Sequence, residues 1–323
     1  MGIIREKKIT SKYSKVMLTE SLYSLALYIY MNNSVSDTLF LIGDNVKLGD
    51  IKNKLNNVII YNNELACGKN RTERIMMFMR LYIGRFYELK KYITCVDDFY
   101  GHDHVSFSSL FDKRKFTVIE DGLSNYKNPK ISNLKVGLLV LFRVDFRARG
   151  YNVKTNKVIL TGLDDIPESI RDKVTIINRN DFINNLEYIC DGAFSYKEEI
   201  KDKSILLITQ PLSEDDVLSE FEKIEIYKEI LGEFINSEYL IIKPHPRERT
   251  DYKLYFPNAT IIKSGFLVES LLNKKSIIKV VTLFSTAVFS IQCVDVEIYG
   301  TWKSSKLSSR YGVIKSNVIQ KRI

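Results

Sequence analysis

The segment FTVIEDGLSNY, from Phe116 to Tyr126, places two carboxylates at the end of a predicted buried strand. Glu120 and Asp121 follow four residues with strand character, and Gly122 comes directly after them. Ligands of parallel α/β sheets bind beyond the carboxyl ends of strands. A carboxylate there can take a proton from a substrate hydroxyl, and a glycine lets a ligand approach the backbone. An acidic turn that only ends a strand would look the same, so this segment alone leaves both interpretations open.

A second candidate is the histidine in IIKPHPRE, from Ile241 to Glu248. His245 lies between Pro244 and Pro246, and proline fixes its own backbone and restricts the residue before it. A histidine held stiffly where a strand ends suits phosphate binding or proton donation to a leaving group. A rigid exposed turn with an incidental histidine is the alternative. Further positive charge surrounds it, from Lys243, Arg247 and Arg249.

Two later segments also carry candidate ligand contacts. In VTLFSTAVFSI, Ser285 and Thr286 open an apparent helix, and a helix start binds phosphate well. The same hydroxyls could serve as an ordinary helix cap. In SGFLVESLL, Glu269 could take both hydroxyls of a ribose or face solvent.

The acidic pairs and the other two histidines give no clear metal site. Asp97-Asp98, Asp164-Asp165 and Asp215-Asp216 could hold a divalent ion through oxygen ligands, but each is expected in a solvated loop. His102 and His104 have the look of a metal pair, but no third ligand is evident. No metal is therefore expected.

Composition restricts the class of protein. The chain has 323 residues, 45% of them hydrophobic and 27% charged, as in ordinary globular proteins. The net charge of +9 favours anionic partners, but the basic residues are dispersed and nucleic-acid binding is not expected. No secretory signal or membrane-spanning run is evident. A cytoplasmic protein is expected, with peripheral contact at the inner face of the plasma membrane through its basic surface. The cysteines at 67, 95, 190 and 293 are expected to be reduced thiols.

Apolar runs that alternate with amphipathic segments predict an α/β fold with two domains. Strands are predicted at 15–20, 37–44, 58–62, 116–121, 204–210, 238–246, 259–265 and 278–284. Helices are predicted at 21–31, 71–92, 219–235, 266–272 and 285–292. The segment 154–203 has weak periodicity and is predicted to form loops and helix starts, with the domain boundary near 196–204.

The order of these motifs resembles that of bacterial sialyltransferases. An acidic pair before glycine, then His-Pro, then a glutamate, then Ser-Thr is most similar to glycosyltransferase family 52, the lipooligosaccharide and capsular polysaccharide sialyltransferases. The opening KVMLTESLYSLALYIYM also resembles that family, so the likeness spans Lys15 to about Gln292. It implies a GT-B architecture, two Rossmann-like domains with the active site in the interdomain cleft. Residues 1–200 would form the acceptor-side domain and 201–323 the CMP-donor-binding domain.

The resemblance also implies a reaction. Sialic acid would move with inversion from CMP-sialic acid (CMP-Neu5Ac) to a terminal galactoside of a bacterial surface glycan, with no cofactor or metal required. Asp121 would be the general base, with Glu120 as its supporting neighbour, and His245 would contact the CMP phosphate and assist its departure. Glu269 would bind the ribose, and Ser285 and Thr286 the phosphate. The full set of donor-binding candidates is Glu120, Gly122, Lys243, Pro244, Pro246, Ser264, Glu269, Ser285 and Thr286.

Several alternatives stay open. Asp215 or Asp216 could be the base in place of Asp121. A related fold could use another nucleotide sugar, of the glucosyl type, or the chain could be a non-catalytic protein of polysaccharide assembly. Relatives of the family suggest a homodimer. The acceptor, the linkage, and the choice between capsule and lipooligosaccharide are left open by the sequence.

Overall fold

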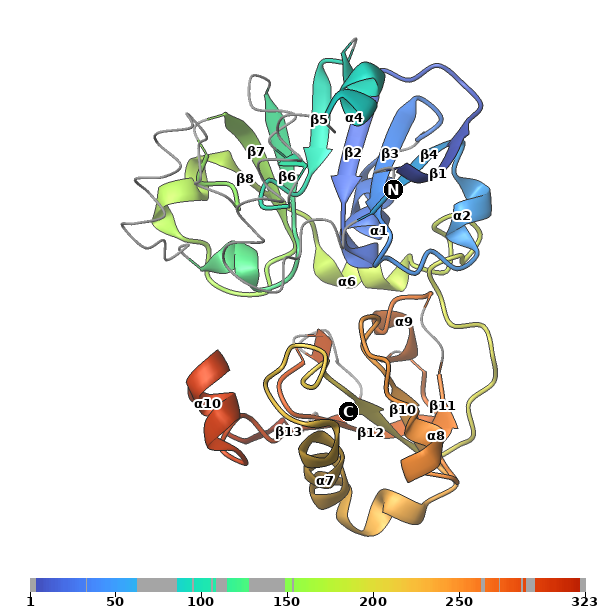
Figure 1. The fold of residues 1–323 in the computed structure, drawn as a ribbon, viewed down its shortest axis with the longest axis vertical. Helices are drawn as coiled ribbons and strands as arrows, with labels where there is room; N and C mark the ends of the chain where they lie inside the picture. Colours follow the sequence, from blue (N-terminus) through green and yellow to red (C-terminus); the bar gives the residue numbers. More distant parts are fainter. Residues whose placement is uncertain are drawn as a thin grey trace. The chain divides into compact units, whose positions relative to one another are not determined.

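The computed structural model divides the chain into two compact units, residues 1–193 and 194–323. Figure 1 shows the elements of both units. The residues that the structure describes are 4–32, 34–62, 86–94, 96–105, 107–108, 115–127, 149–152, 154–262, 265–272, 274–285, 287–288 and 294–319. Among these described residues, no helix has the length and apolar character needed to cross a membrane.

The first unit contains an eight-stranded sheet with the order β1-β4-β3-β2-β5-β6-β7-β8. Neighbouring strands are parallel except β1, which is antiparallel to β4. From β4 to β7 the order is that of a Rossmann sheet, in which the chain first builds outward from one strand and then continues on that strand's other side. The strands are β1 (Ile4–Ile9), β2 (Lys15–Thr19), β3 (Thr38–Gly43), β4 (Asn57–Tyr61), β5 (Asp98–Gly101), β6 (Phe116–Ile119), β7 (Thr155–Leu160) and β8 (Val174–Ile176).

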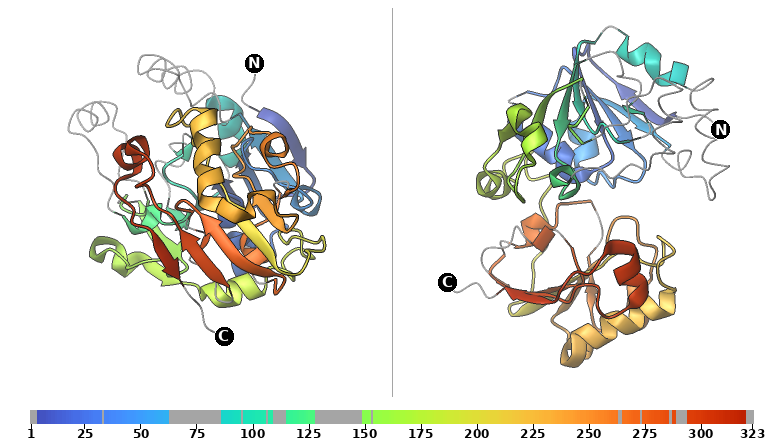
Figure 2. Two further views of the ribbon diagram at one scale, coloured as in Figure 1. Left: turned by 90° about the horizontal axis from the view of Figure 1, so that it is seen from below. Right: turned by 90° about the vertical axis from the view of Figure 1, so that its left-hand side faces the viewer.

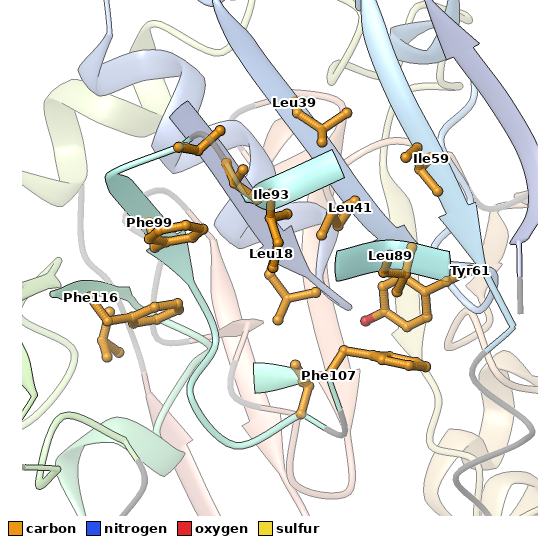
Figure 3. Packing of buried hydrophobic residues seen from close by; sticks show 14 of the residues in the cluster. Leu18, Leu39, Leu41, Ile59, Tyr61, Leu89, Ile93, Phe99, Phe107 and Phe116 are labelled. Carbon is orange, nitrogen blue, oxygen red and sulfur yellow. The ribbon is translucent and has the colours of Figure 1, made fainter. Parts of the chain in front are cut away.

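Both faces of this sheet are covered, as buried parallel strands require. Helix α1 begins after Ser21, whose hydroxyl accepts a hydrogen bond from the main-chain N–H of Ser24 and so caps the helix. Leu89 and Ile93 of α4 pack on strand residues such as Leu18, and Figure 3 shows this apolar cluster. The helices and 3₁₀ turns of the unit are α1 (Leu22–Met31), α2 (Ile51–Lys54), α4 (Phe86–Ile93), η4 (Ser124–Tyr126), η5 (Glu168–Lys173) and α6 (Arg179–Asn184).

The second unit contains a six-stranded sheet with the order β11-β10-β9-β12-β13-β14. Its strands are again parallel, except that β14 is antiparallel to β13. The order from β11 to β13 repeats the Rossmann pattern, with the reversal between β9 and β12. The strands are β9 (Ser204–Ile208), β10 (Leu240–Lys243), β11 (Thr260–Ile261), β12 (Ile277–Thr282), β13 (Asp295–Ile298) and β14 (Asn317–Ile319).

Alternate residues of β9 enter two different cores, because side chains on a strand alternate between faces. Leu207 packs in the cluster that contains α7, and Leu206 packs in the cluster that contains Leu271 of α9. Figures 1 and 2 show α7 and α9 on opposite faces of this sheet. The helices and 3₁₀ turn are α7 (Glu220–Leu231), η6 (Gly232–Asn236), α8 (Tyr252–Tyr255), α9 (Glu269–Leu272) and α10 (Ser305–Tyr311).

The predicted fold class, α/β with two Rossmann-like units as in the GT-B architecture, is confirmed. One prediction on a single element was wrong. The weakly periodic segment 154–203 contains two strands, β7 and β8, in addition to short helical turns. The charged run IREKKI forms β1, an edge strand whose middle residues are exposed, and lysine on an edge strand is a common guard against unwanted pairing. Most of the helix predicted at 71–92 lies outside the described residues, and its last part is α4.

Gly101 ends β5 where the chain must pass close to β2. Its φ is +122°, and a Cβ atom there would lie 1.8 Å from the carbonyl oxygen of Leu18. We expect Gly101→Ala to lower the free energy of unfolding by more than about 3 kcal/mol, because a main-chain clash adds to backbone strain. Gly162 also has a positive φ, +76°, but open space around it, so Gly162→Ala is expected to cost only about 1–2 kcal/mol. Urea denaturation measures both, and equal losses would contradict the close approach.

Candidate active site

Four adjacent strands of the first unit end at the same edge of the sheet, because they are parallel neighbours in the order β2-β5-β6-β7. Glu20 follows β2, His102 follows β5, Glu120 follows β6 and Thr161 follows β7. The strand order reverses between β2 and β5, which is where Rossmann-like sheets bind their ligands. The first two of these residues lie on either side of that reversal.

Asp121 presents a partly exposed carboxylate at this edge. Its side chain is 31% exposed, and Oδ2 lies 3.3 Å from Nε2 of His104. Oδ1 lies 3.9 Å from Nε2 of His102, and the hydroxyl of Ser21 is a further hydrogen-bond partner. The main-chain N–H of Asp121 donates to Oδ1 of Asn125 at 2.7 Å. The carboxylate is therefore held from several sides and still reachable by a ligand.

The charge state of Asp121 follows from these neighbours. Burial would raise the pKa of its carboxyl, but His102, His104 and the Ser21 hydroxyl outweigh burial and hold that pKa well below the usual range. Asp121 is thus ionised at neutral pH. Gly122 comes next with φ +71°, a left-handed conformation that glycine adopts without strain, as the sequence argument required.

His102 has a defined tautomer. The hydroxyl of Ser24 donates its only proton to the carbonyl oxygen of Glu120, so it must accept a proton from Nε2 of His102, 2.7 Å away. The lone pair is then on Nδ1, which faces the main-chain N–H of Glu20 at 3.5 Å. Burial lowers the pKa of His102 to about 4 despite the nearby Asp121, so the ring is neutral.

Proximity alone would allow a metal ion at this cluster. Among the described residues, His102, His104 and Asp121 can place one ligand atom each within 4.8 Å of one another. The third ligand, which the sequence did not reveal, comes from the strand next to that of the histidines. A cation bound by Nε2 of His102 would have to displace the proton donated to Ser24. The expectation that no metal is needed stays a prediction.

Glu120 points into the unit, away from solvent. It is fully buried, and its carboxylate accepts hydrogen bonds from the hydroxyl of Tyr126 at 2.6 Å and from the hydroxyl of Thr161 at 2.7 Å. Burial raises the pKa of Glu120, and these donors offset burial only in part. The carboxylate ties the end of β6 to the end of β7. Its predicted part in donor binding is untested.

In the second unit, His245 lies in a turn directly after β10, between Pro244 and Pro246. The N–H of Glu248 donates to the carbonyl oxygen of His245 at 2.9 Å and closes the turn. Nδ1 of His245 accepts the main-chain N–H of Arg247 at 3.2 Å. The proton of the neutral ring is therefore on Nε2, for which the described contacts show no acceptor.

Lys243 and Glu269 are close enough to influence each other. Lys243 is 5% exposed and its ammonium nitrogen lies 5.2 Å from the centre of the Phe266 ring. Burial lowers the pKa of Lys243 to about 8, although Glu248 and Glu269 act in the opposite direction. Glu269 begins α9 and is 6% exposed. Two of the predicted donor-binding residues thus share one region of the second unit.

Ser285 follows the end of β12, and its N–H donates to the hydroxyl oxygen of Thr282 at 3.2 Å. Because β12 and β9 are neighbours at the strand reversal, this position lies where Rossmann-like sheets bind ligands. Ser264 and Thr286 lie outside the described residues, as does most of the helix predicted at 285–292.

One of the two alternative bases, Asp215, is already engaged. Both carboxylate oxygens of Asp215 accept hydrogen bonds from the guanidinium group of Arg247, at 2.6 and 3.0 Å. A bidentate pair of this kind is among the stronger charge-assisted contacts in proteins. Asp121 has no such arginine partner among the described contacts. The other alternative, Asp216, is exposed, and the choice between it and Asp121 stays a prediction.

The chain was compared with known proteins. The model of glycosyltransferase family 52 matches residues 39–303.

The chain belongs to glycosyltransferase family 52.

This family 52 member is also similar in sequence to a curated protein. A protein of Haemophilus influenzae, described as uncharacterized, is 37% identical over 241 residues, which cover 71% of this chain and 77% of that protein. Membership of this family identifies the chain as a glycosyltransferase. The sugar that it transfers is a separate question.

The solved structures with a similar backbone fold have low sequence identity to this chain. The UDP-GlcNAc 2-epimerase of Methanocaldococcus jannaschii, in complex with UDP-GlcNAc and UDP, is 13% identical, with 93% of this chain and 86% of that chain covered and a TM-score of 0.49. The wall teichoic acid polymerase TagF is 12% identical, with 86% and 67% covered and a TM-score of 0.43. The UDP-GlcNAc 2-epimerase of Neisseria meningitidis is 12% identical, with 85% and 78% covered and a TM-score of 0.42.

The buried position of Glu120 predicts a stability effect in this family 52 member. Glu120→Gln would place an amide N–H₂ against the donors from Tyr126 and Thr161, and we expect it to lower the free energy of unfolding by about 1–3 kcal/mol. Urea denaturation tests this. Glu187→Gln, on an exposed residue of the same unit, is the control and should change little. An unaffected Glu120→Gln variant would contradict the network.

Proposed function

We propose that this family 52 glycosyltransferase moves sialic acid with inversion from CMP-sialic acid to a terminal galactoside of a bacterial surface glycan. The observation that carries the proposal is the ionised, partly exposed carboxylate of Asp121 at the strand-end edge of the first unit. The sialic acid donor and the galactoside acceptor rest on the motif resemblance. The placement of the active site between the two units is part of the proposal.

On the acceptor side, Asp121 would take the proton of the attacking hydroxyl as the new bond to the sugar forms. Its low pKa keeps the carboxylate free of a proton before the reaction, and His104 and Ser21 fix its orientation. The hydroxyl becomes acidic as it attacks a positively charged sugar. A weakly basic carboxylate can therefore accept its proton late in the reaction.

On the donor side, Lys243 and Nε2–H of His245 would stabilise the departing CMP phosphate. Lys243 is the last residue of β10, and His245 lies two residues beyond it, at the carboxyl end of that strand. Preorganised donors aimed at developing negative charge are often the largest catalytic contribution in enzymes. Glu269, near Lys243, would take the ribose hydroxyls, and Ser285 would add a phosphate contact.

Removal of the base should abolish transfer and leave donor binding intact. We expect Asp121→Asn to lower kcat/KM about a hundred- to ten-thousandfold. CMP affinity should stay within about twofold of the wild type, because the groups proposed to contact the phosphate and ribose, on Lys243, His245 and Glu269, are in the second unit. Asp191→Asn, whose side chain is 83% exposed, is the matched control. Mass detection of the sialylated product measures transfer. Normal turnover by Asp121→Asn would remove Asp121 from the mechanism.

The choice of donor has its own test. We expect calorimetric titration to show binding of CMP and none of UDP, because CMP is the nucleotide of the proposed donor. Transfer from CMP-sialic acid to a panel of galactosides should be unaffected by EDTA. Preference for UDP would favour a related transferase with another nucleotide sugar, and loss of activity with EDTA would contradict metal independence.

A further inference from the structure

A charged cluster is buried beneath the turn that holds His245. The side chains of Lys223, from α7, and Glu248, from the turn, are both fully buried, and Lys223 Nζ lies 3.7 Å from Glu248 Oε1. Nζ also lies 3.0 Å from Oε2 of Glu220 and donates to Ser213 at 2.7 Å. Buried charges are costly unless they are paired and hydrogen-bonded, and here several partners satisfy the ammonium group.

Glu248 connects this cluster to the histidine. Its Oε2 accepts the main-chain N–H of His245 at 2.6 Å and also the hydroxyl of Thr209. Its Oε1 accepts the hydroxyl of Tyr252 at 2.6 Å. In return, the N–H of Glu248 donates to the carbonyl oxygen of His245. The main chain of His245 is thus fixed in both directions by one buried residue.

The turn also fixes the proton of the imidazole. Arg247 gives its main-chain N–H to Nδ1 of His245, and its guanidinium group is held by Asp215. The charged groups around the ring are Arg247, Lys243, Asp215, Glu214 and Glu248. Burial, with Arg247 and Lys243, lowers the pKa of His245 to about 4, which is in keeping with a ring that carries one proton, on Nε2.

We propose that Glu248, buried beside Lys223, is a positioning residue that locks His245 as an uncharged Nε2–H donor toward the ligand. The proposal rests on the proposed function for the identity of that ligand, the phosphate of a nucleotide. His245 then binds the departing phosphate by a hydrogen bond and transfers no proton to it, because loss of Nε2–H from a neutral ring would leave an imidazolate. The phosphate leaves as an anion, and Lys243 supplies the positive charge.

The wild-type protein gives the decisive measurement. Nitrogen-15 NMR of histidine-labelled protein, with the His245 signal assigned from His245→Asn, distinguishes the two neutral tautomers and the imidazolium. We expect the neutral Nε2–H form at about pH 6, where an ordinary histidine is largely protonated. An imidazolium or an Nδ1–H tautomer at that pH would overturn the proposal. This readout needs no substrate, so it stands apart from the proposed function.

The role of Glu248 is tested by Glu248→Gln. The amide keeps the size of the side chain but removes the charged acceptor of the His245 N–H. We expect a mixture of His245 tautomers by NMR and CMP binding weakened about tenfold, as for loss of a hydrogen bond to a charged group. Glu225→Gln, on an exposed glutamate of the same α7 that pairs with Lys228, is the control and should leave both unchanged.

The outcomes separate cleanly. An unchanged tautomer with unchanged CMP affinity in Glu248→Gln would overturn the positioning role. A changed tautomer would support it whether or not CMP binds. Failure of CMP to bind the wild type at all would count against the proposed donor and leave the NMR result on His245 intact.

Discussion

The hydrogen bond from the Ser24 hydroxyl to the carbonyl oxygen of Glu120 joins helix α1 to the end of β6. Because the Ser24 hydroxyl donates its proton to that carbonyl, it accepts a hydrogen bond from Nε2 of His102. Nδ1 of His102 is then unprotonated and faces the main-chain N–H of Glu20. The main chain just before Asp121 is therefore held by a buried chain of donors and acceptors. Networks of this kind are strong only when every member is hydrogen-bonded. The network therefore also holds the main chain from which the Asp121 carboxylate projects.

The second unit contains a histidine with the same hydrogen-bonding pattern, on a different sheet. In both units a histidine after a strand accepts a main-chain N–H at Nδ1 and is left with its proton on Nε2. In the first unit that proton is used internally, toward Ser24. In the second, no partner within the described contacts of His245 takes it. The same local chemistry thus supports the main chain in the first unit and, under the proposed function, would bind a ligand in the second.

Local sequence was enough to predict the strand and the turn that hold Asp121. The strand before Asp121 and the turn at Gly122 were readable because apolar residues and a glycine mark them in order. His104 as a partner of Asp121 was not readable, since it depends on β5 and β6 being neighbours in the sheet. Glu248 stood inside a motif already noticed, but its importance depends on Lys223 of α7, which only the folded chain brings near.

Strands β7 and β8 were missed for a physical reason. In β7, two charged or polar positions follow the first residue, so the apolar run is only three residues long. β8 is a three-residue edge strand without a fully buried residue. Neither has a period that separates a strand from a loop. Strand β7 is placed by parallel pairing with β6, and β8 by parallel pairing with β7. Such pairing is a tertiary effect that overrides weak local preference.

Each unit consists of one uninterrupted stretch of chain, with the division between residues 193 and 194. A single genetic crossover near that point would exchange one complete sheet together with its covering helices, and would interrupt neither of the two sheets. Relatives could then acquire a new front half in one recombination event and keep an intact back half. Diversity in such a lineage can arise by reassortment of whole halves as well as by point substitution.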